Sequence, residues 1–294
     1  MRRRIVLSIV LGCWSVLCGT GILWSYQWPV EPRILSVFAQ GGDGFERGIQ
    51  LSSSGEPVKP IDDGELVFYS LQNNVSSSLP YALGNFVVLQ HGDALRSLYA
   101  HLESVDFSEG IERKQVQKSD PLGKVGLSGA TSIPGMSLFV YDLEARQFVN
   151  PFLLLPPVKD TSKPVIRNVQ LEKKGEIIPL PAKEPVPKGT WEVTAELFDL
   201  SSAVKTFWPM GIYKVGLYLN GQESFLVAMD TLKEEGGITR IYPSKGLSYQ
   251  DLYNGKFRMK LGSVALNPGV LNLEIVARDF AGNERNQVYR FRVE

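Results

Sequence analysis

The residue types that could carry catalysis or hold a metal ion are scarce in this chain. The sequence contains two histidines, His91 and His101. Both of its cysteines, Cys13 and Cys18, lie near the N-terminus, so the remainder has no thiolate nucleophile, cysteine-bound metal or disulfide. A hydrolytic zinc centre needs about three nitrogen or oxygen ligands and an open position for water. Two histidines and a few carboxylates, among them Glu46, leave little material for such a centre.

Both histidines also have structural interpretations. His101 either hydrogen-bonds the backbone beneath a groove or contacts a ligand, whereas His91, in a His-Gly turn, is typical of a residue that orders the turn. Three nearby glycines, Gly123, Gly126 and Gly129, resemble a phosphate-binding loop, but no helical pattern follows them. Tight turns between strands explain these glycines, so we expect no nucleotide site.

The composition is that of an ordinary globular chain. Of its 294 residues, 44% are apolar and 21% are charged, which suits two modest domains with hydrophobic cores and excludes a disordered chain. The 31 basic residues balance the 31 acidic ones. Because the net charge is zero, the composition does not favour nucleic acid as a partner.

The N-terminus has the layout of an export signal. Arg2–Arg4 precede an apolar stretch at residues 5–24 that contains no charge. We interpret residues 1–24 as a secretion signal or as an uncleaved membrane anchor whose arginines stay on the cytoplasmic side. Lipid modification of Cys13 is a further alternative, because Val10–Cys13 loosely resembles a lipobox. In each case the body of the protein is exported to a periplasmic or other extracytoplasmic location, and we favour anchoring by the apolar stretch.

Short strands separated by turn residues predict an all-β fold. Residues 33–155 contain several such runs and no long amphipathic helix, which indicates a compact antiparallel β domain. Eight of the 18 prolines fall between Pro151 and Pro187, so residues 156–189 are expected to be a proline-rich connector.

The last part of the chain, residues 190–294, alternates apolar and polar side chains with clear period two. Asn220-Gly221 is a strong hairpin signal between two such runs. We therefore expect an immunoglobulin-like β-sandwich after the connector, and one apolar helix at the N-terminus of the whole chain.

A series of short motifs follows in fixed order along the first domain. In chain order they are Arg33–Phe38, Phe45–Gln50, Gly55–Pro60, Asp63–Val67, Gly84–Gly92, Leu98–Leu102, Val116–Gly129 and Gly135–Phe139. The series resembles the LytM or lysostaphin-type zinc endopeptidases, which cut peptidoglycan cross-bridges, over about 120 residues. The resemblance implies a compact β domain with a groove.

In that family the zinc ion is bound by a His-x-x-x-Asp pair and by the second histidine of a His-x-His pair. The resemblance places Glu46 and Gln50 at the first two ligand positions and Phe139 at the third. An amide is a poor ligand and a phenyl ring offers no donor atom. The resemblance therefore implies a degenerate peptidase domain that holds no metal or cofactor and is not an enzyme.

The catalytic positions of the family are also changed. Ser137 replaces the first histidine of the His-x-His pair, and Tyr141 stands where a glutamate often follows it. His101 matches the catalytic histidine of the Tyr-Ala-His-Leu motif, but without a metal-bound water it is vestigial. The residues expected to line a partner-binding groove are His101, Tyr99, Ser137, Phe139 and Tyr141.

Relatives of the EnvC and NlpD type lost the same ligands and act as regulators. By this resemblance we predict a non-catalytic exported protein that binds a cell-wall hydrolase such as an amidase, or peptidoglycan peptides. One alternative is an active zinc endopeptidase with an unorthodox metal site around Glu46 and His101. Another is a structural or adhesive envelope protein.

Overall fold

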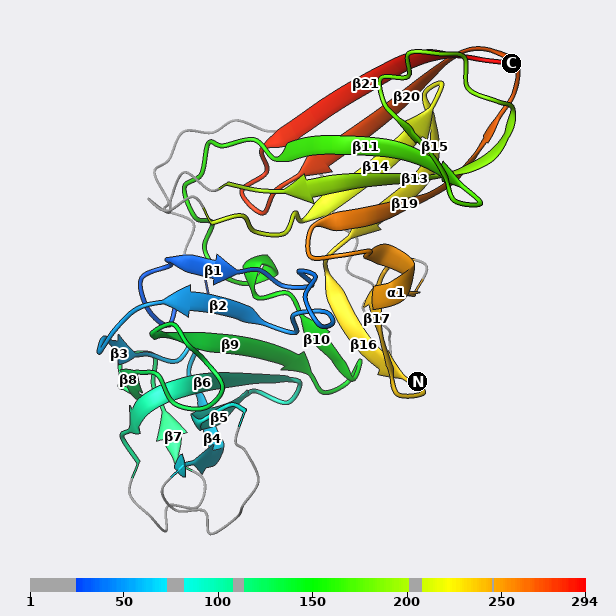
Figure 1. Ribbon diagram of the computed structural model, residues 1–294. Coiled ribbons are helices and arrows are strands. Elements are labelled where there is room, and N and C mark those ends of the chain that lie inside the picture. The colour runs from blue at the N-terminus through cyan, green and yellow to red at the C-terminus, as the bar shows by residue number, and fades with distance from the viewer. Residues whose placement is uncertain (1–24, 73–81, 108–113, 201–207, 245) are drawn as a thin grey trace, which may run out of the picture.

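The computed structural model describes residues 25–72, 82–107, 114–200, 208–244 and 246–294. The predicted signal or anchor at residues 1–24 and both cysteines lie outside the described residues. Within the part that is described, no helix is long and apolar enough to cross a membrane. The fold is nearly all β, as predicted, and its strands form antiparallel sheets (Figure 1).

The first domain is built on a large antiparallel sheet in which β10, β9, β6, β5 and β4 lie side by side in that order (Figure 1). Shorter strands extend it, since β2 pairs with β1 and β9, and β8 pairs with β3 and β6. Its strands are β1 (Ile34–Ser36), β2 (Ile49–Ser52), β3 (Pro57–Val58), β4 (Gly64–Ser70), β5 (Asn85–His91), β6 (Leu95–Val105), β7 (Gln115–Val116), β8 (Gly123–Val125), β9 (Gly135–Asp142) and β10 (Gln147–Val149).

Alternation along β9 shows how the sequence separates the two faces of this sheet. Met136, Leu138 and Val140 are buried in the hydrophobic core. The alternate residues Ser137, Phe139 and Tyr141 point to the opposite face because successive side chains of a strand alternate. The sheet therefore has a core face and a more open face, and the open face carries the candidate site.

The second domain consists of two four-stranded antiparallel sheets, ordered β12-β11-β13-β19 and β15-β14-β20-β21. The sheets pack against each other where β19 contacts β14 and β15 and where β11 contacts β21. Trp191 is fully buried between them. The strands are β11 (Val165–Lys173), β12 (Glu176–Pro179), β13 (Gly189–Phe198), β14 (Lys214–Leu219), β15 (Gln222–Ala228), β19 (Arg258–Leu266), β20 (Gly269–Arg278) and β21 (Glu284–Val293).

The boundary between the domains differs from the sequence-based expectation. Residues 156–189 were expected to be connector, but they contain β11 and β12, and β11 pairs with β13 along most of its length. The prolines are accommodated because Pro164 precedes β11 and Pro179 ends β12, which is an edge strand that needs fewer backbone donors. The sandwich therefore begins near Val165.

An insertion in the second domain extends the sheet of the first. It comprises β16 (Thr231–Glu235), β17 (Ile238–Tyr242), β18 (Leu247–Ser248) and the short helix α1 (Tyr249–Leu252). β16 pairs with β10 from Thr231 opposite Val149 to Lys233 opposite Gln147. The two domains thus share one continuous β-sheet. The sequence analysis predicted two separate domains and did not predict this shared sheet.

The second domain also holds the loop that precedes β2. The Tyr249 hydroxyl donates to the carbonyl of Gly42 at 2.6 Å, and the Tyr253 hydroxyl donates to the carbonyl of Ala39 at 3.1 Å. The side chain of Gln40 accepts from the backbone N–H of Gly211 at 2.8 Å. This loop leads directly into the family's first ligand position, so the second domain helps to position it.

Candidate functional site

Three neighbouring strands bring part of the candidate site together. Gln50 on β2 lies opposite Ser137 on β9, and Ser137 lies opposite Ala100 on β6. His101 follows Ala100, and its ring reaches the same place. Gln50, Ser137 and His101 line one very small cavity of about 10 Å³, so the structure does bring these three predicted residues together.

The backbone at His101 has an unusual conformation. Its φ angle is 65°, in the left-handed region that non-glycine residues adopt rarely. Backbone bonds on both sides fix it, since its N–H donates to Leu83 O at 2.9 Å and its carbonyl accepts from Gly126 N–H at 3.1 Å. The ring Nδ1 lies 2.9 Å from the carbonyl of Ser128 and must donate to it, so in the neutral ring Nε2 is an acceptor.

Glu46 lies in the turn before β2, at the edge of a cleft of about 430 Å³. Gln50 lines this cleft from β2 of the first domain, and Trp208 and Lys256 line it from the second domain. Burial raises the pKa of Glu46 above its usual value because the ionised form loses hydration, although a backbone hydrogen bond from Gly48 acts in the opposite direction. Glu46 and Gln50 therefore share a cleft that the two domains build jointly.

Phe139, which the sequence resemblance places at the third ligand position, lies in a different cavity. This groove has a volume of about 360 Å³, and its lining is Arg47, Leu83, Val88, Arg96, Ser97, Leu98, Phe139, Tyr141 and Phe148. The rings of Tyr141 and Phe148 meet edge to face with their centroids 5.1 Å apart. The guanidinium of Arg47 lies over the ring of Phe148, 5.6 Å from its centroid.

The apolar surface continues beyond the groove toward β4. Phe68 lies opposite Val88, which lines the groove, and directly opposite residues share a face of the sheet. The Phe68 side chain is 55% exposed, and its ring centroid lies 5.7 Å from that of Phe86. The open face of the sheet therefore carries a band of aromatic and aliphatic side chains with two arginines.

A zinc ion does not fit the residues that the sequence resemblance places at the family's ligand positions. Phe139 has no donor atom and lines a cavity other than that of Glu46 and Gln50. Within the described ranges, no three His, Cys, Asp or Glu side chains converge around Glu46. Zinc in hydrolases takes nitrogen, sulfur or carboxylate ligands and needs about three from the protein, so this donor set does not meet the requirement.

Comparison with known protein families identifies the domain that carries these positions. The sequence model of peptidase family M23 matches residues 44–151. Residues 44–151 form a peptidase family M23 domain. This confirms the expected LytM-type domain.

Two curated relatives match part of this chain. The cell division protein DipM of Caulobacter vibrioides is 30% identical over 142 residues, which are 48% of this chain and 20% of that protein. The murein hydrolase activator NlpD of Escherichia coli is 27% identical over 105 residues, 35% of this chain and 26% of that protein. Thus the chain spans about a quarter or less of the length of these two relatives. Among solved structures, the antimicrobial peptidase lysostaphin of Staphylococcus simulans covers 82% of this chain and 92% of its own, with 16% identity and a TM-score of 0.37.

Tyr99 does not lie in the groove of the M23 domain, contrary to the sequence-based expectation. Its side chain is 0% exposed and lies in the core, because Tyr99 pairs with Leu138 on the core face of β9. The Tyr99 hydroxyl accepts from the Ile61 N–H at 2.8 Å and lies 2.9 Å from the hydroxyl of Ser97. Tyr99 is therefore a structural residue of the M23 domain.

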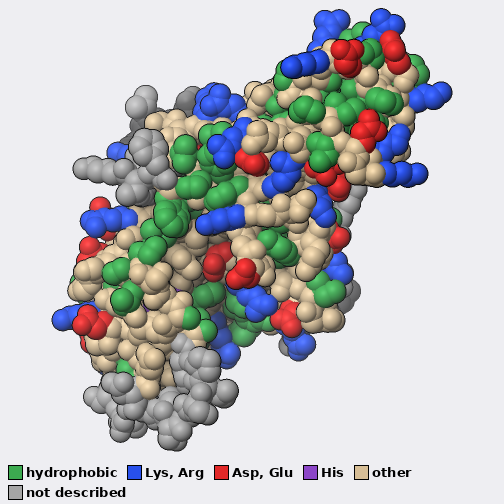
Figure 2. All heavy atoms as spheres, viewed as in Figure 1, with side chains coloured by type: hydrophobic (Ala, Val, Ile, Leu, Met, Phe, Trp, Pro, Cys, Tyr) green, Lys and Arg blue, Asp and Glu red, His purple; other side chains and the backbone are tan. Residues whose placement is uncertain are grey.

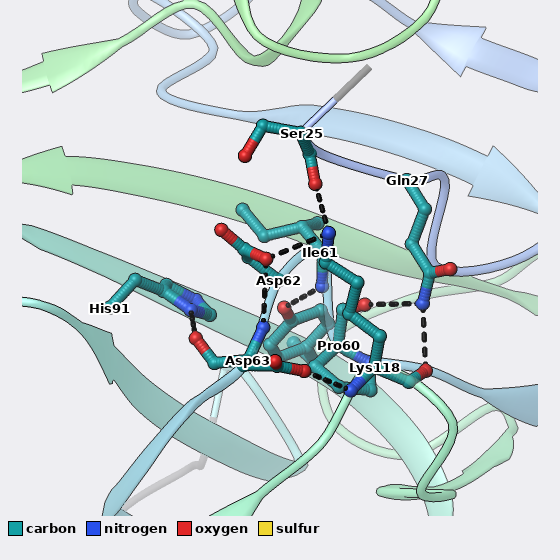
Figure 3. Close-up of polar contacts among 9 residues, drawn as sticks. Ser25, Gln27, Pro60, Ile61, Asp62, Asp63, His91 and Lys118 are labelled. Carbon is teal, nitrogen blue, oxygen red and sulfur yellow. Dashed lines mark hydrogen bonds and ion pairs between the residues drawn. The ribbon is translucent and has the colours of Figure 1, made fainter. Parts of the chain in front are cut away.

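His91 is held in a network of polar contacts, as Figure 3 shows. Its Nδ1 donates to the carbonyl of Asp63 at 2.8 Å, and its Nε2 accepts from the hydroxyl of Ser97 at 2.7 Å. Burial outweighs the neighbouring aspartates and lowers the pKa of His91, which favours the neutral ring that this pattern needs. Lys118 completes the turn, since its N–H donates to Asp63 Oδ1 at 2.7 Å and its ammonium group pairs with Asp62 at 2.9 Å. His91 thus orders a turn of the M23 domain.

Sequence reasoning missed several residues of the groove in the M23 domain. Arg47, Arg96 and Phe148 were not singled out, although each lines the groove. Arg47 directly follows Glu46, and Phe148 lies on a strand that pairs with β9 next to Tyr141. Their positions depend on strand pairing, so sequence patterns alone did not reveal them.

Proposed function

We propose that this chain is a non-catalytic, exported M23-type protein that regulates cell-wall remodelling by binding a murein hydrolase through the groove of its M23 domain. The observation that carries the proposal is the groove itself. The third family ligand position, Phe139, contributes a ring to its lining instead of a metal ligand. The former catalytic face then serves as a docking surface.

The groove has the composition of a protein-binding surface. Aromatic residues and arginine are enriched in the energetically important parts of protein interfaces. Here Phe139, Tyr141 and Phe148 supply the aromatic surface, and Arg47 and Arg96 supply positive charge at its border. This chemistry suits a partner segment that presents apolar side chains together with one or two carboxylates.

The surface outside the groove gives no comparable preference. On the face drawn in Figure 2, basic and acidic side chains are interspersed over both domains. The balance of 31 basic and 31 acidic residues agrees with this distribution. Long-range attraction to a polyanion therefore does not compete with the groove as an explanation of partner choice.

Two further points of the proposal come from the sequence and the relatives. The arginines and the apolar stretch at residues 5–24 support export and membrane anchoring. The relatives DipM and NlpD are by their names a cell division protein and a murein hydrolase activator, which supports a role at the cell wall. An amidase is the hydrolase class that we propose as the partner, and peptidoglycan peptides are the alternative ligand.

The proposal can be tested with the purified full-length chain, an N-acetylmuramoyl-L-alanine amidase and dye-labelled peptidoglycan. We expect the chain alone to release no dye, with or without added zinc, and to accelerate release by the amidase. Arg96→Glu should weaken binding to the amidase at least about tenfold, as expected for an interface arginine. Arg290→Glu is the matched control, because Arg290 is exposed on β21 in the second domain.

Two outcomes would reject the proposed function, and a third would reject the groove as the binding site. Chelator-sensitive release of dye by the chain alone would establish an active endopeptidase with an unorthodox metal site. Failure to bind either the amidase or peptidoglycan peptides would favour a structural envelope protein. Equal binding by the Arg96→Glu and Arg290→Glu variants would leave the partner in place but remove the groove as its site.

A further inference from the structure

The cleft of about 430 Å³ beside Glu46 is separate from the groove that carries the proposed function, since the two share no lining residue. Its volume lies in the range of small-molecule sites, which is about 300–1,000 Å³. Polar side chains, glycines and one tryptophan make up most of its lining. The cleft is therefore a polar cavity of ligand size that the two domains form together.

The first domain supplies hydrogen-bonding groups that are not already used within the described residues. Gln40 is 7% exposed, and its Oε1 accepts from the Gly211 N–H at 2.8 Å. This bond fixes the amide, while Nε2 of Gln40 donates to no residue that the structure describes. Glu46 accepts from the Gly48 N–H and has no cationic partner in the described ranges. Together with the amide of Gln50, these groups offer a ligand both donors and acceptors.

The second domain supplies an aromatic surface in the same cleft. The Trp208 side chain is 41% exposed. The ammonium group of Lys256 lies 5.5 Å from the centroid of the Trp208 ring and 5.4 Å from that of Phe257, so it helps to fix the indole. The charged side chains of the lining are Lys256, Glu46 and Asp43. Because carboxylates outnumber the ammonium group, the cleft does not favour an anionic ligand.

The loop at residues 41–46 is held in place by the second domain. The ring of Phe45 meets those of Tyr249 and Tyr253 edge to face, with centroid distances of 5.7 and 6.0 Å. Gly41 approaches the second domain so closely that a Cβ there would lie 2.8 Å from the carbonyl oxygen of Lys256. Because these contacts order the wall in advance, a ligand would lose little binding energy to ordering it.

We propose that this cleft binds a neutral oligosaccharide, with one sugar ring against Trp208 and hydroxyl groups on Gln40, Glu46 and Gln50. A pyranose ring has an apolar face of C–H groups and a rim of hydroxyls that both donate and accept. The exposed indole suits the apolar face, and the amides and the carboxylate suit the rim. The inference assigns a ligand to a second site and thus goes beyond the proposed function. Only the source of the sugar, the glycan strands of the cell wall, rests on that function.

The test uses the purified full-length chain with chitotriose and cellotriose as probes. Both present pyranose rings and hydroxyls, whereas chitotriose alone carries the acetamido groups of amino sugars, so the two probes distinguish an amino-sugar site from a general saccharide site. We expect at least one of them to bind at one site per chain by calorimetric titration and to change the tryptophan fluorescence. Triglycine, a peptide of comparable length, should not bind.

Variants of the lining assign the binding to the cleft. Trp208→Ala should weaken saccharide binding at least about tenfold, because it removes the aromatic surface. Glu46→Gln keeps the size of the side chain and should weaken binding by about threefold or more, since hydrogen bonds to a carboxylate are stronger than those to an amide. Ile177→Ala is the matched control. Ile177 is 55% exposed on β12 and does not line the cleft, so this variant should bind as the unmodified chain does.

Three results would overturn the proposal. Neither trisaccharide binds, triglycine displaces a bound trisaccharide, or Trp208→Ala unfolds at the same temperature as the unmodified chain and binds saccharide equally well. If Trp208→Ala lowers the unfolding midpoint, Gln50→Ala takes its place, because it removes a hydrogen-bonding group and keeps the indole; unchanged binding by that variant is then the contrary result. None of these measurements uses the amidase, so failure of the cleft as a saccharide site is distinguishable from failure of the proposed function.

Discussion

Replacement of Tyr99 by phenylalanine tests whether this tyrosine, part of the family motif, supports the fold and not the groove. The Tyr99→Phe substitution keeps the ring and removes one buried oxygen, so it opens little space in the core. That oxygen accepts from the Ile61 N–H at 2.8 Å and lies 2.9 Å from the Ser97 hydroxyl. An unpartnered buried donor costs about 1–3 kcal/mol and a lost hydrogen bond about 1 kcal/mol, which together predict a loss of about 2–4 kcal/mol in the free energy of unfolding.

The assay is urea denaturation of the full-length chain followed by tryptophan fluorescence, with the slope of the unfolding transition expected to stay unchanged. Tyr141→Phe is the matched control, because Tyr141 is half-buried in the groove and its ring contacts survive the change. It should alter the free energy of unfolding by less than about 0.5 kcal/mol. Ser97→Ala combined with Tyr99→Phe should cost less than the sum of the two single changes, since both remove the same bond. If Tyr99→Phe behaves as Tyr141→Phe does, the hydroxyl network does not stabilise the domain and the reasoning fails.

Three other perturbations address different parts of the structure. Burial holds the pKa of His91 below its usual value, so the unfolded chain binds more protons than the folded chain as the pH falls below about 6.5. The free energy of unfolding should therefore decrease between pH 7 and 5. His91→Gln should flatten this pH dependence in urea titrations. Gly126→Val should lower the free energy of unfolding by more than about 2 kcal/mol, because a Cβ at this position would lie 2.3 Å from the backbone nitrogen of Glu103. Gly44→Ala is the control: a Cβ at Gly44 has no atom within 4 Å, so this change should be tolerated. Asn150→Ala removes a buried hydrogen bond of 2.6 Å to the Met229 carbonyl, and a loss of about 2 kcal/mol is expected in the same urea assay.

Local patterns predicted the strands well because period two and turn chemistry are local properties. The Asn220-Gly221 hairpin is confirmed between β14 and β15, with φ angles of 50° and 79° at the two turn residues. Both angles are positive, as a type I′ turn requires, and Asn-Gly tolerates them best. The buried residues of β9 likewise follow the alternation of the sequence.

The candidate site was harder to predict because its geometry depends on one departure from regular alternation. In a regular strand Tyr99 and His101 would lie on the same face of β6. The positive φ of His101 breaks the alternation, so Tyr99 enters the core while His101 lines a cavity with Ser137 and Gln50. No pattern of residue types signals this change, since histidine only tolerates the left-handed region and does not require it.

The boundary of the domains was mispredicted for a related reason. Proline density indicates where regular pairing is interrupted, but it does not distinguish a connector from an edge strand that begins or ends at proline. The pairing of β10 with β16 joins residues more than 80 positions apart, at Phe148 and Leu232. Such a pairing depends on how the two domains dock. A period-two pattern identifies a strand but does not identify the strand with which it pairs.

This shared ladder connects the groove with the rest of the molecule. Arg47 lies over Phe148 in the groove and donates to the Thr239 hydroxyl on β17 at 3.0 Å, and it lies 3.8 Å from the carboxylate of Glu234 on β16. A partner in the groove would therefore touch side chains that the second domain holds in place. Because exposed ion pairs contribute little by themselves, the position of Arg47 depends mainly on the β10–β16 pairing. The second domain thus helps to hold Arg47, a residue that lines the groove, in place.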